Sequence, residues 1–544
     1  MKNIRTLFIL PILFLAAFYF YPLVAILQTS FAGTGASGFA ELLGDNYYLR
    51  VLGFTIAQAA LSTLLTLVVA LPAAYIFARF DFRGASLMRA LTTIPFLMPT
   101  IVVATAFSAL LGPRGSVNLA LMQVFQLDSP PIQILNTVWI ILLAHTFYNF
   151  TIVLRIVGGF WANLDPQIEN AARVLGANRV RTLVEITLPL LAPAIIAAAL
   201  LVFIFDFTSF GVVLILGGPR LATLEVEIYR QTVNLFDLPL AAALSLVQLV
   251  CTFGLMLVYT RLQARLAQPL RLQPRTLTQR KPHGARENIF VWGYLAAMLG
   301  FLMTPLISVA AASFEDGLGH YAALFVNARG SISFVPPIEA VRNSLFFAGV
   351  TVFLAVGLGL IAAYAIASPN RAARFLDPLF MLPLGTSAVT LGFGFILALD
   401  QPPLNLRTSI WLVPIAHTLV AFPFVVRSLL PMLRSIQPRL REAAQMLGAS
   451  PWRVWREIDL PMVARAVVIG AVFAFTVSIG EFGATALVAR PELPTIPIAI
   501  YRFLGQPGIA NFGQALALST ILMVVSALAI VAMERVRVGT VGEF

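Results

Sequence analysis

The sequence predicts an all-α polytopic membrane protein with about 12 transmembrane helices, arranged as two homologous six-helix halves. Hydrophobic residues make up 59% and charged residues 11% of the 544 residues, whereas a soluble domain carries about 25% charged residues. The same pattern of residues also recurs after half the chain length. Together these observations exclude a string of soluble domains and predict two related sets of helices that span a lipid bilayer.

Twelve apolar segments are long enough to cross about 30 Å of hydrocarbon at about 1.5 Å per residue. They are residues 6–28, 52–78, 89–111, 133–157, 190–216 and 240–260, then 289–311, 343–367, 376–399, 409–432, 462–488 and 511–533. The first has no small-residue cleavage site, so we expect a retained helix rather than a signal peptide. The predicted organisation is a first half over 1–261, a linker over 262–288 and a second half over 289–544.

Basic residues predict how the spans are oriented. The net charge is +12, and most Arg and Lys residues lie in segments that fall on one side when twelve spans are threaded through a bilayer. Because basic loops favour the cytoplasm, we expect both termini, the linker and the loops at 164–189 and 436–461 to be cytoplasmic. The excess of positive charge therefore indicates how the spans are oriented in the membrane. It does not predict nucleic acid as a partner.

The internal repeat is clearest in two polar loops, which we call the first repeated loop (164–189) and the second repeated loop (436–461). At a constant offset of 272, Asn170, Ala171, Ala172, Gly176 and Pro189 correspond to Glu442, Ala443, Ala444, Gly448 and Pro461. Two halves with equal numbers of spans share one orientation and are related by an axis along the membrane normal. We therefore expect a translocation pathway between them.

Each repeated loop is expected to form a helix, a glycine turn and a second helix. Asp165-Pro166 can start the first helix, since aspartate caps it and proline has no amide to leave unpaired. Gly176 and Gly448 suit the left-handed residue that ends a helix, and Asn178 and Ser450 can cap the next one. Two uses remain open: docking of a soluble partner, or an amphipathic helix that anchors the loop at the membrane surface.

The second repeated loop has Glu-Ala-Ala, three residues, Gly, nine residues and Ile-x-Leu-Pro over 442–461. This pattern resembles the signature of permease subunits of binding-protein-dependent ABC importers, and the resemblance covers nearly the whole chain. It implies the type I ABC importer permease fold in a bacterial inner membrane. It also implies two copies of an ABC ATPase on the repeated loops and a solute-binding protein on the outer face. In the family the Glu contacts a basic ATPase residue, which is implied for Glu442 but not for Asn170, where Glu169 stands one residue early.

The fusion of both halves in one chain resembles the ferric-iron and thiamine branch of the family. Segments 143–149 and 216–229 are most similar to thiamine permeases, whereas 478–483 resembles a wider group that includes oxyanion permeases. The resemblance implies thiamine as the substrate, with ferric iron as a close alternative.

The chain is not expected to be an enzyme or to bind a cofactor. A phosphate-binding loop needs a lysine in a Gly-x-x-x-x-Gly-Lys run, and neither Lys2 nor Lys281 lies in one. ATP and Mg would therefore be used by the partner ATPase. The alternatives are a twelve-span secondary transporter driven by an ion gradient and, more remotely, a membrane-embedded enzyme.

Acidic and aromatic residues near the fifth and eleventh spans are the candidate pathway residues. Intramembrane charges are costly and usually face a cavity, so Asp206 or Glu481 could meet a cationic substrate where aromatic side chains narrow the pathway. These aromatic residues are Phe207, Phe210 and Phe482. The alternative for each acid is a structural hydrogen bond at a helix bend.

Two histidines, His145 and His417, occupy equivalent positions. No cysteine or carboxylate cluster accompanies either of them in the sequence. We therefore expect histidines packed and hydrogen-bonded within their own halves rather than a metal site.

Overall fold

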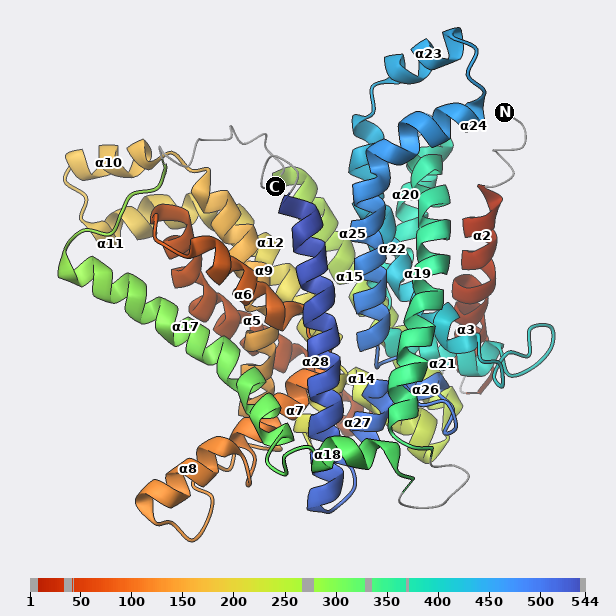
Figure 1. The fold of residues 1–544 in the computed structure, drawn as a ribbon, viewed down its shortest axis with the longest axis horizontal. Coiled ribbons are helices and arrows are strands. Elements are labelled where there is room, and N and C mark those ends of the chain that lie inside the picture. The colour runs from red at the N-terminus through yellow and green to blue at the C-terminus, as the bar shows by residue number, and fades with distance from the viewer. Residues whose placement is uncertain are drawn as a thin grey trace.

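The computed structural model describes residues 8–33, 42, 44–266, 278–327, 335–367 and 371–538, and most of them are helical (Figure 1). No strand forms among these residues beyond an isolated bridge between Phe80 and Arg280. Eleven of the described helices are long and apolar enough to cross a membrane, or twelve if one bent pair counts as a span. The predicted all-α polytopic fold is confirmed. Both chain ends and residues 267–277 of the predicted linker lie outside the described residues.

The main helices of the first half are α2 (Ile9–Leu15), α3 (Tyr21–Gly33), α5 (Asn46–Arg79), α6 (Ala85–Leu97), α7 (Thr100–Leu111), α8 (Ser116–Phe125), α9 (Val138–Ala162), α10 (Pro166–Val174), α11 (Arg179–Thr182), α12 (Leu188–Phe207), α13 (Gly211–Leu216), α14 (Leu224–Tyr229) and α15 (Leu238–Leu266). Those of the second half are α17 (Gly284–Ser313), α18 (Gly319–Ala322), α19 (Ile338–Ala367), α20 (Arg371–Met381), α21 (Ala388–Ala398), α22 (Leu412–Ser435), α23 (Pro438–Met446), α24 (Pro451–Val454), α25 (Leu460–Gly480), α26 (Thr485–Val488), α27 (Ile496–Leu504) and α28 (Ile509–Val538).

Four predicted spans are interrupted or shorter than expected. The predicted span 89–111 is divided between α6 and α7, because Met98 takes an extended conformation before Pro99, as residues before proline tend to do. The predicted span 376–399 is divided between α20 and α21, and the bend there measures 96°. Spans 190–216 and 462–488 end early, at Phe207 and Gly480. Hydropathy continues across these breaks, which is why an apolar pattern does not reveal them.

The first helix of each half packs on the other half. Leu15 and Tyr19, of the helix that starts at Ile9, lie in the core of the second half, and the Tyr19 hydroxyl is 2.7 Å from Thr386 Oγ1. In return, Leu295 of α17 lies in the core of the first half, and the Tyr294 hydroxyl donates to the Val69 carbonyl. Figure 1 shows α17 beside α5 and α9, and α2 beside α19 and α22. The two halves are therefore interlocked.

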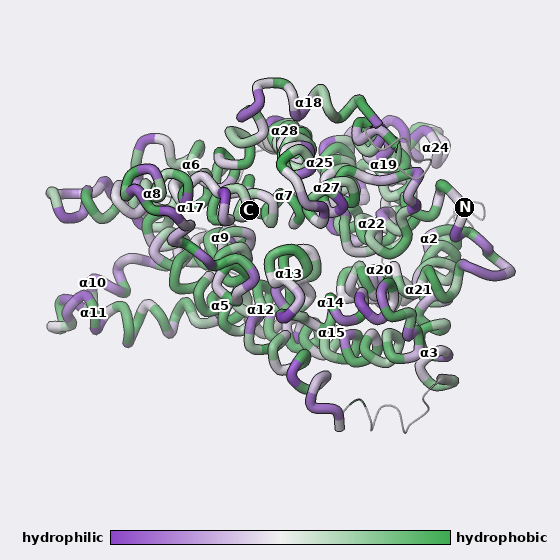
Figure 2. Tube along the Cα trace, turned by 90° about the horizontal axis from the view of Figure 1, so that it is seen from below, coloured by the Kyte–Doolittle hydropathy of each residue, from purple (hydrophilic) through white to green (hydrophobic). Residues whose placement is uncertain are grey.

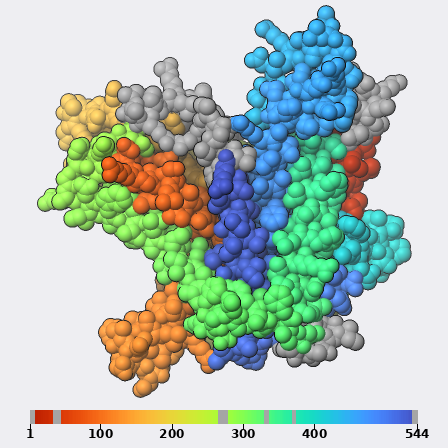
Figure 3. Space-filling view, viewed as in Figure 1, coloured from red at the N-terminus to blue at the C-terminus, as the bar shows by residue number. Residues whose placement is uncertain are grey.

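Hydrophobic residues dominate the long helices, and hydrophilic residues gather in the segments that connect them (Figure 2). The two repeated loops, which contain α10 with α11 and α23 with α24, project from the same end of the molecule (Figures 1 and 3). The segments with α8 and α18 lie at the opposite end. The repeated loops are therefore placed to be reached together from one side.

Candidate functional site

Both repeated loops have the predicted helix, glycine turn and second helix. In the first loop the Asp165 carboxylate accepts a hydrogen bond from the Gln167 amide at 2.9 Å, and Asn178 accepts one from the Arg181 amide at 2.8 Å. Gly176 has φ +91° and Gly448 has φ +81°, a left-handed conformation that glycine adopts without steric cost. The local fold of the loops is thus confirmed.

A π-helical turn precedes the membrane helix that follows each repeated loop. These turns are η2 (Leu183–Thr187) and η6 (Trp455–Asp459), at equivalent positions in the two halves. Pro189 and Pro461 are the second residues after these turns. Proline cannot donate to the carbonyl four residues before it and its ring collides with that carbonyl, so a wider turn accommodates it. The sequence analysis missed these turns. Through them α11 continues into α12 and α24 into α25, so that each loop is joined to its span without a flexible break.

A charged hydrogen bond holds the first helix of each repeated loop, to α5 in the first half and within the loop itself in the second. Arg79 donates to the Glu169 carboxylate at 2.9 Å, and the Thr187 hydroxyl donates to the same oxygen at 3.2 Å. In the second half Arg441, the counterpart of Glu169, donates to Asp459 at 2.8 Å. Glu169 therefore faces into the protein and does not replace the missing acid at position 170.

The predicted loop residues are mostly exposed. Asn170, Ala171, Gly176 and Pro189 are exposed in the first loop, as are Glu442, Ala443, Gly448 and Pro461 in the second, whereas Ala172 is buried and Ala444 is half-buried. No contact with a partner tests them, so their role in ATPase coupling stays a prediction.

Apolar residues that the sequence analysis missed form the tip of each repeated loop. Val174 and Leu175 are 87% and 88% exposed, and their counterparts Met446 and Leu447 are 88% and 89% exposed. Two adjacent apolar side chains that are this exposed form a surface that a partner protein can bury. The signal was present in the sequence, as two apolar residues immediately before each loop glycine.

An aromatic cluster crosses the boundary between the halves. We use this name for four residues: Phe210, Tyr229, Phe482 and Tyr501. The Phe210 and Phe482 rings stack with centroids 5.4 Å apart, and each contacts the tyrosine of its own half, at 5.3 Å and 5.5 Å. A Cβ on Gly211 would lie 3.1 Å from the Phe482 ring and 2.7 Å from Thr100 Oγ1, so the close approach requires glycine there.

Phe207, the third predicted aromatic residue of the pathway, lies elsewhere. Its ring stacks on Phe203 of the same helix, with centroids 6.0 Å apart. The structure therefore brings together two of the three predicted phenylalanines, and it adds two tyrosines, Tyr229 and Tyr501.

Each candidate acid lies beside the histidine of its own half, an association that the sequence analysis did not foresee. Asp206 accepts a hydrogen bond from Asn149 Nδ2 at 2.7 Å and lies 3.4 Å from His145. Glu481 accepts from the amides of Ala484 and Thr485 at 2.8 Å and 3.0 Å, and it lies 3.4 Å from His417. The acids are buried at the breaks after α12 and α25. Their role in the pathway stays a prediction.

The histidines also have hydroxyl partners within their own halves, as expected. His145 contacts Ser62 Oγ at 3.0 Å and Ser209 Oγ at 2.8 Å. His417 contacts the hydroxyls of Ser478 and Thr485, both at 2.8 Å. Both ring nitrogens of each histidine are thus occupied. Within the described part of the chain, no group of three or more His, Cys, Asp or Glu residues is arranged to hold a metal ion.

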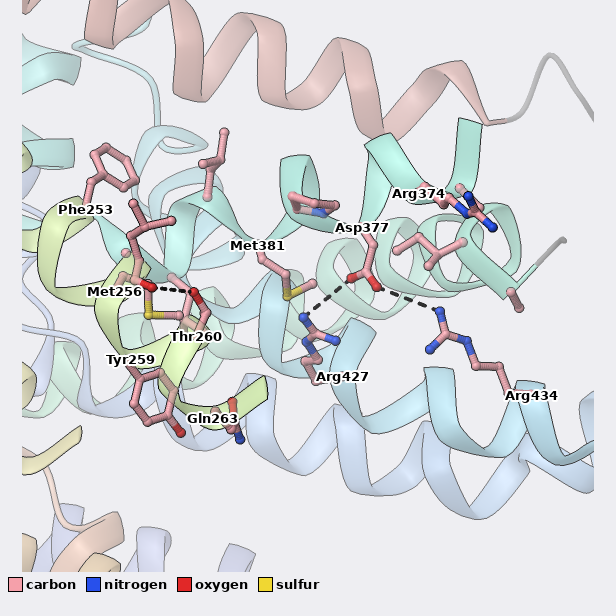
Figure 4. A pocket seen from close by; sticks show the side chains of 18 residues that line it. Phe253, Met256, Tyr259, Thr260, Gln263, Arg374, Asp377, Met381, Arg427 and Arg434 are labelled. Carbon is pink, nitrogen blue, oxygen red and sulfur yellow. Dashed lines mark hydrogen bonds and ion pairs between the residues drawn. The ribbon is translucent and has the colours of Figure 1, made fainter. Parts of the chain in front are cut away.

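A cavity of about 1450 Å³ lies between the halves, with α15 on one side and α20 and α22 on the other (Figure 4). Asp377 lies 3.5 Å from Arg427 and 3.8 Å from Arg434, and Arg374 lines the same region. The lining also includes apolar and aromatic side chains, such as Phe253 and Met381. This is a space between the halves that a small solute could occupy.

Replacing Gly448 with valine is expected to disturb the second repeated loop and little else. No atom lies within 4 Å of the position that a Cβ would take, so the cost is the left-handed backbone itself, about 1–2 kcal/mol. Gly448→Asn is the matched control, since asparagine tolerates this conformation. We expect the valine variant to purify as a folded protein with weakened ATPase stimulation, and the asparagine variant to resemble wild type. Normal stimulation in the valine variant would count against a coupling role.

Comparison with known proteins agrees with this arrangement. The family model described as Binding-protein-dependent transport system inner membrane component matches residues 67–270 and again residues 355–537. The chain is 28% identical over 475 residues to the thiamine transport system permease protein of Brucella abortus, which covers 87% of this chain and 85% of the relative.

Two further relatives differ in name and coverage. A probable ABC transporter permease protein of Sinorhizobium fredii is 26% identical over 551 residues, or 97% of this chain and 95% of the relative. A putative 2-aminoethylphosphonate transport system permease protein of Salmonella paratyphi A is 26% identical over 263 residues, or 47% of this chain and 91% of the relative. With two matches of the family model that together span most of its length, this chain belongs to the binding-protein-dependent transport system inner membrane components, the permease subunits of ABC importers.

Proposed function

We propose that this chain forms the translocation pathway of an importer for thiamine. The aromatic cluster carries the proposal, because its rings meet at the boundary of the halves and can also contact a heteroaromatic solute. The similarity to the thiamine permease of Brucella abortus supports the choice of substrate.

In this proposal the repeated loops, the linker and both termini are cytoplasmic. A solute-binding protein delivers thiamine at the opposite face. Two copies of a separate ATPase bind the repeated loops and hydrolyse ATP, and this chain binds no cofactor of its own. The position of both loops at one end of the molecule supports a shared docking side.

The mechanism is a movement of the halves as rigid bodies. Closure of the ATPase dimer on ATP draws the repeated loops together. Because α11 runs through η2 into α12, and α24 runs through η6 into α25, the displacement reaches the spans directly. The break after each of these spans holds Phe210 or Phe482, so the movement parts the aromatic cluster and opens the pathway to the outer face. Return of the halves restacks the rings behind the solute, which leaves through the cavity between α15 and α20.

Reconstitution tests this function directly. The chain is placed in liposomes with its ATPase, and the binding protein loaded with radiolabelled thiamine is added outside. We expect uptake that requires internal ATP and is unaffected by collapse of proton and sodium gradients. A matched ATPase variant unable to hydrolyse ATP is the control. Absence of thiamine uptake, or its displacement by excess ferric iron, would overturn the substrate assignment.

A further inference from the structure

A buried glutamate lies one helical turn from the aromatic cluster. Glu225 is in α14, four residues before Tyr229, and its side chain is 0% exposed. One carboxylate oxygen accepts from Gln248 Nε2 of α15 at 2.9 Å. The other accepts from the Ser387 hydroxyl at 2.5 Å. Since Ser387 belongs to the second half, this carboxyl group joins the two halves.

Glu225 has hydrogen-bond donors but no cationic partner. No Arg, Lys or His lies within ion-pair distance of it in the part of the chain that the structure describes. Next to it, Gln248 Oε1 is buried and has no hydrogen-bond partner among the same residues. A buried carboxylate is costly unless it is paired, and intramembrane acids mark solute pathways. The Glu225 carboxylate and Gln248 Oε1 therefore offer hydrogen-bond acceptors to a positively charged group.

The duplication does not repeat this acid at the equivalent position of the second half. At the offset of 272, the counterpart of Glu225 is Pro497, and that of Glu227 is Ala499. The helices α14 and α27 begin at equivalent positions, so one half of the duplicated protein supplies an acid there and the other does not. A single acid fits one solute passing between the halves.

The contact between Glu225 and Ser387 must break when the halves part. Ser387 also caps α21 by accepting from the Val389 and Thr390 amides at 3.1 Å and 3.3 Å, so it moves with the second half. The cavity lies close to this contact, since Gly385, which lines it, is two residues from Ser387. Phe253, also in the lining, is five residues from Gln248, or about 7.5 Å along a helix.

We propose that Glu225 recognises the positive charge of the substrate once the halves part and the bond to Ser387 is lost. This rests on the proposed function, which supplies a solute with a thiazolium cation. In the closed arrangement Ser387 and Gln248 satisfy the carboxyl group. In the parted arrangement the cation takes the place of Ser387, and the neighbouring aromatic rings contact the solute face through cation–π interaction.

Thiamine uptake by the reconstituted complex tests whether the negative charge of Glu225 is needed. Glu225→Gln keeps the shape and removes the anion, and we expect thiamine uptake to fall at least about tenfold. Glu225→Asp keeps the charge while losing reach to Ser387, and it should retain more uptake than the glutamine variant. A purely structural role predicts the reverse order, because glutamine preserves the hydrogen bonds. That order, or unchanged uptake in Glu225→Gln, overturns the proposal.

The matched control is Glu227, which is buried two residues along the same helix. Its carboxylate accepts from Tyr47 at 2.9 Å and Gln231 at 2.7 Å, both in the first half. Glu227→Gln should keep uptake within about twofold of wild type. A loss equal to that of Glu225→Gln would assign the effect to α14 as a whole and not to Glu225.

A second measurement does not depend on the substrate. Cys251 is the only cysteine, so Glu225→Cys in a Cys251→Ser background carries one thiol. We expect a hydrophilic maleimide not to react with this thiol in the nucleotide-free complex and to label it in the vanadate-trapped complex. Failure of wild type to take up thiamine would defeat the substrate assignment alone. Failure of the trapped complex to label would remove Glu225 from the pathway.

Discussion

Leu447→Asp is expected to abolish association with the ATPase while leaving the permease folded. Leu447 is 89% exposed at the tip of the second repeated loop, so the change removes no packing within the chain. Burial of a leucine in a partner's groove contributes about 1.5–3 kcal/mol, and an aspartate would place an unpaired carboxylate there. The combined loss corresponds to association weakened by at least about 100-fold. Co-purification of the ATPase and the thermal stability of the permease are the measurements.

The control is another exposed apolar residue at the opposite end of the molecule. Val124 of α8 is 72% exposed, and Val124→Asp should leave ATPase association unchanged. Leu175→Asp, in the first loop, is expected to weaken association as well, which shows whether both loops are used. Full association of the Leu447 variant would remove the loop tip from the docking surface.

Phe210→Ala is expected to uncouple ATP hydrolysis from transport. The variant loses the stacked contact with Phe482 and the contact with Tyr229. Replacing a buried phenylalanine costs about 3–5 kcal/mol, and here part of that loss falls on the contact that holds the halves together. We expect ATPase activity without substrate to rise by about tenfold, which corresponds to a shift of about 1.4 kcal/mol toward the parted arrangement. Thiamine uptake for each ATP hydrolysed should fall.

Phe207→Ala provides the comparison three residues away. Phe207 is equally buried but stacks only on Phe203 of its own helix among the described ring contacts. It should therefore lower thermal stability without raising substrate-free ATPase activity. Equal uncoupling in both variants would show that general loosening of the first half, and not the aromatic cluster, controls coupling.

The repeated loops show why some features were predictable from the sequence. Asp165, Asn178 and the two loop glycines act through hydrogen bonds and backbone angles within a few residues. Such local interactions depend on the neighbouring sequence alone, so the helix, turn and helix could be predicted. The spans could be predicted for a similar reason, since a bilayer requires about 20 apolar residues for each crossing.

The breaks within the spans are features that the sequence did not predict. Apolar residues continue past Phe207 and Gly480, so hydropathy does not distinguish a helix that ends from one that crosses. The short helices after these breaks pack within their own halves, α13 on α7 and α9 and α26 on α21 and α22, and they meet the other half where Gly211 approaches Phe482. These contacts join residues that are far apart in the chain, which no local pattern records.

By itself, the sequence determined the all-α class, the duplication, the local form of the repeated loops and the family resemblance, because these follow from composition, spacing and short-range geometry. Only the tertiary structure decided that the first helices are exchanged between the halves and that Glu169 faces Arg79. It also brought Phe210 and Phe482 into contact and joined Glu225 to Ser387. These depend on how the halves meet, and distance along the chain does not specify which side chains come together there.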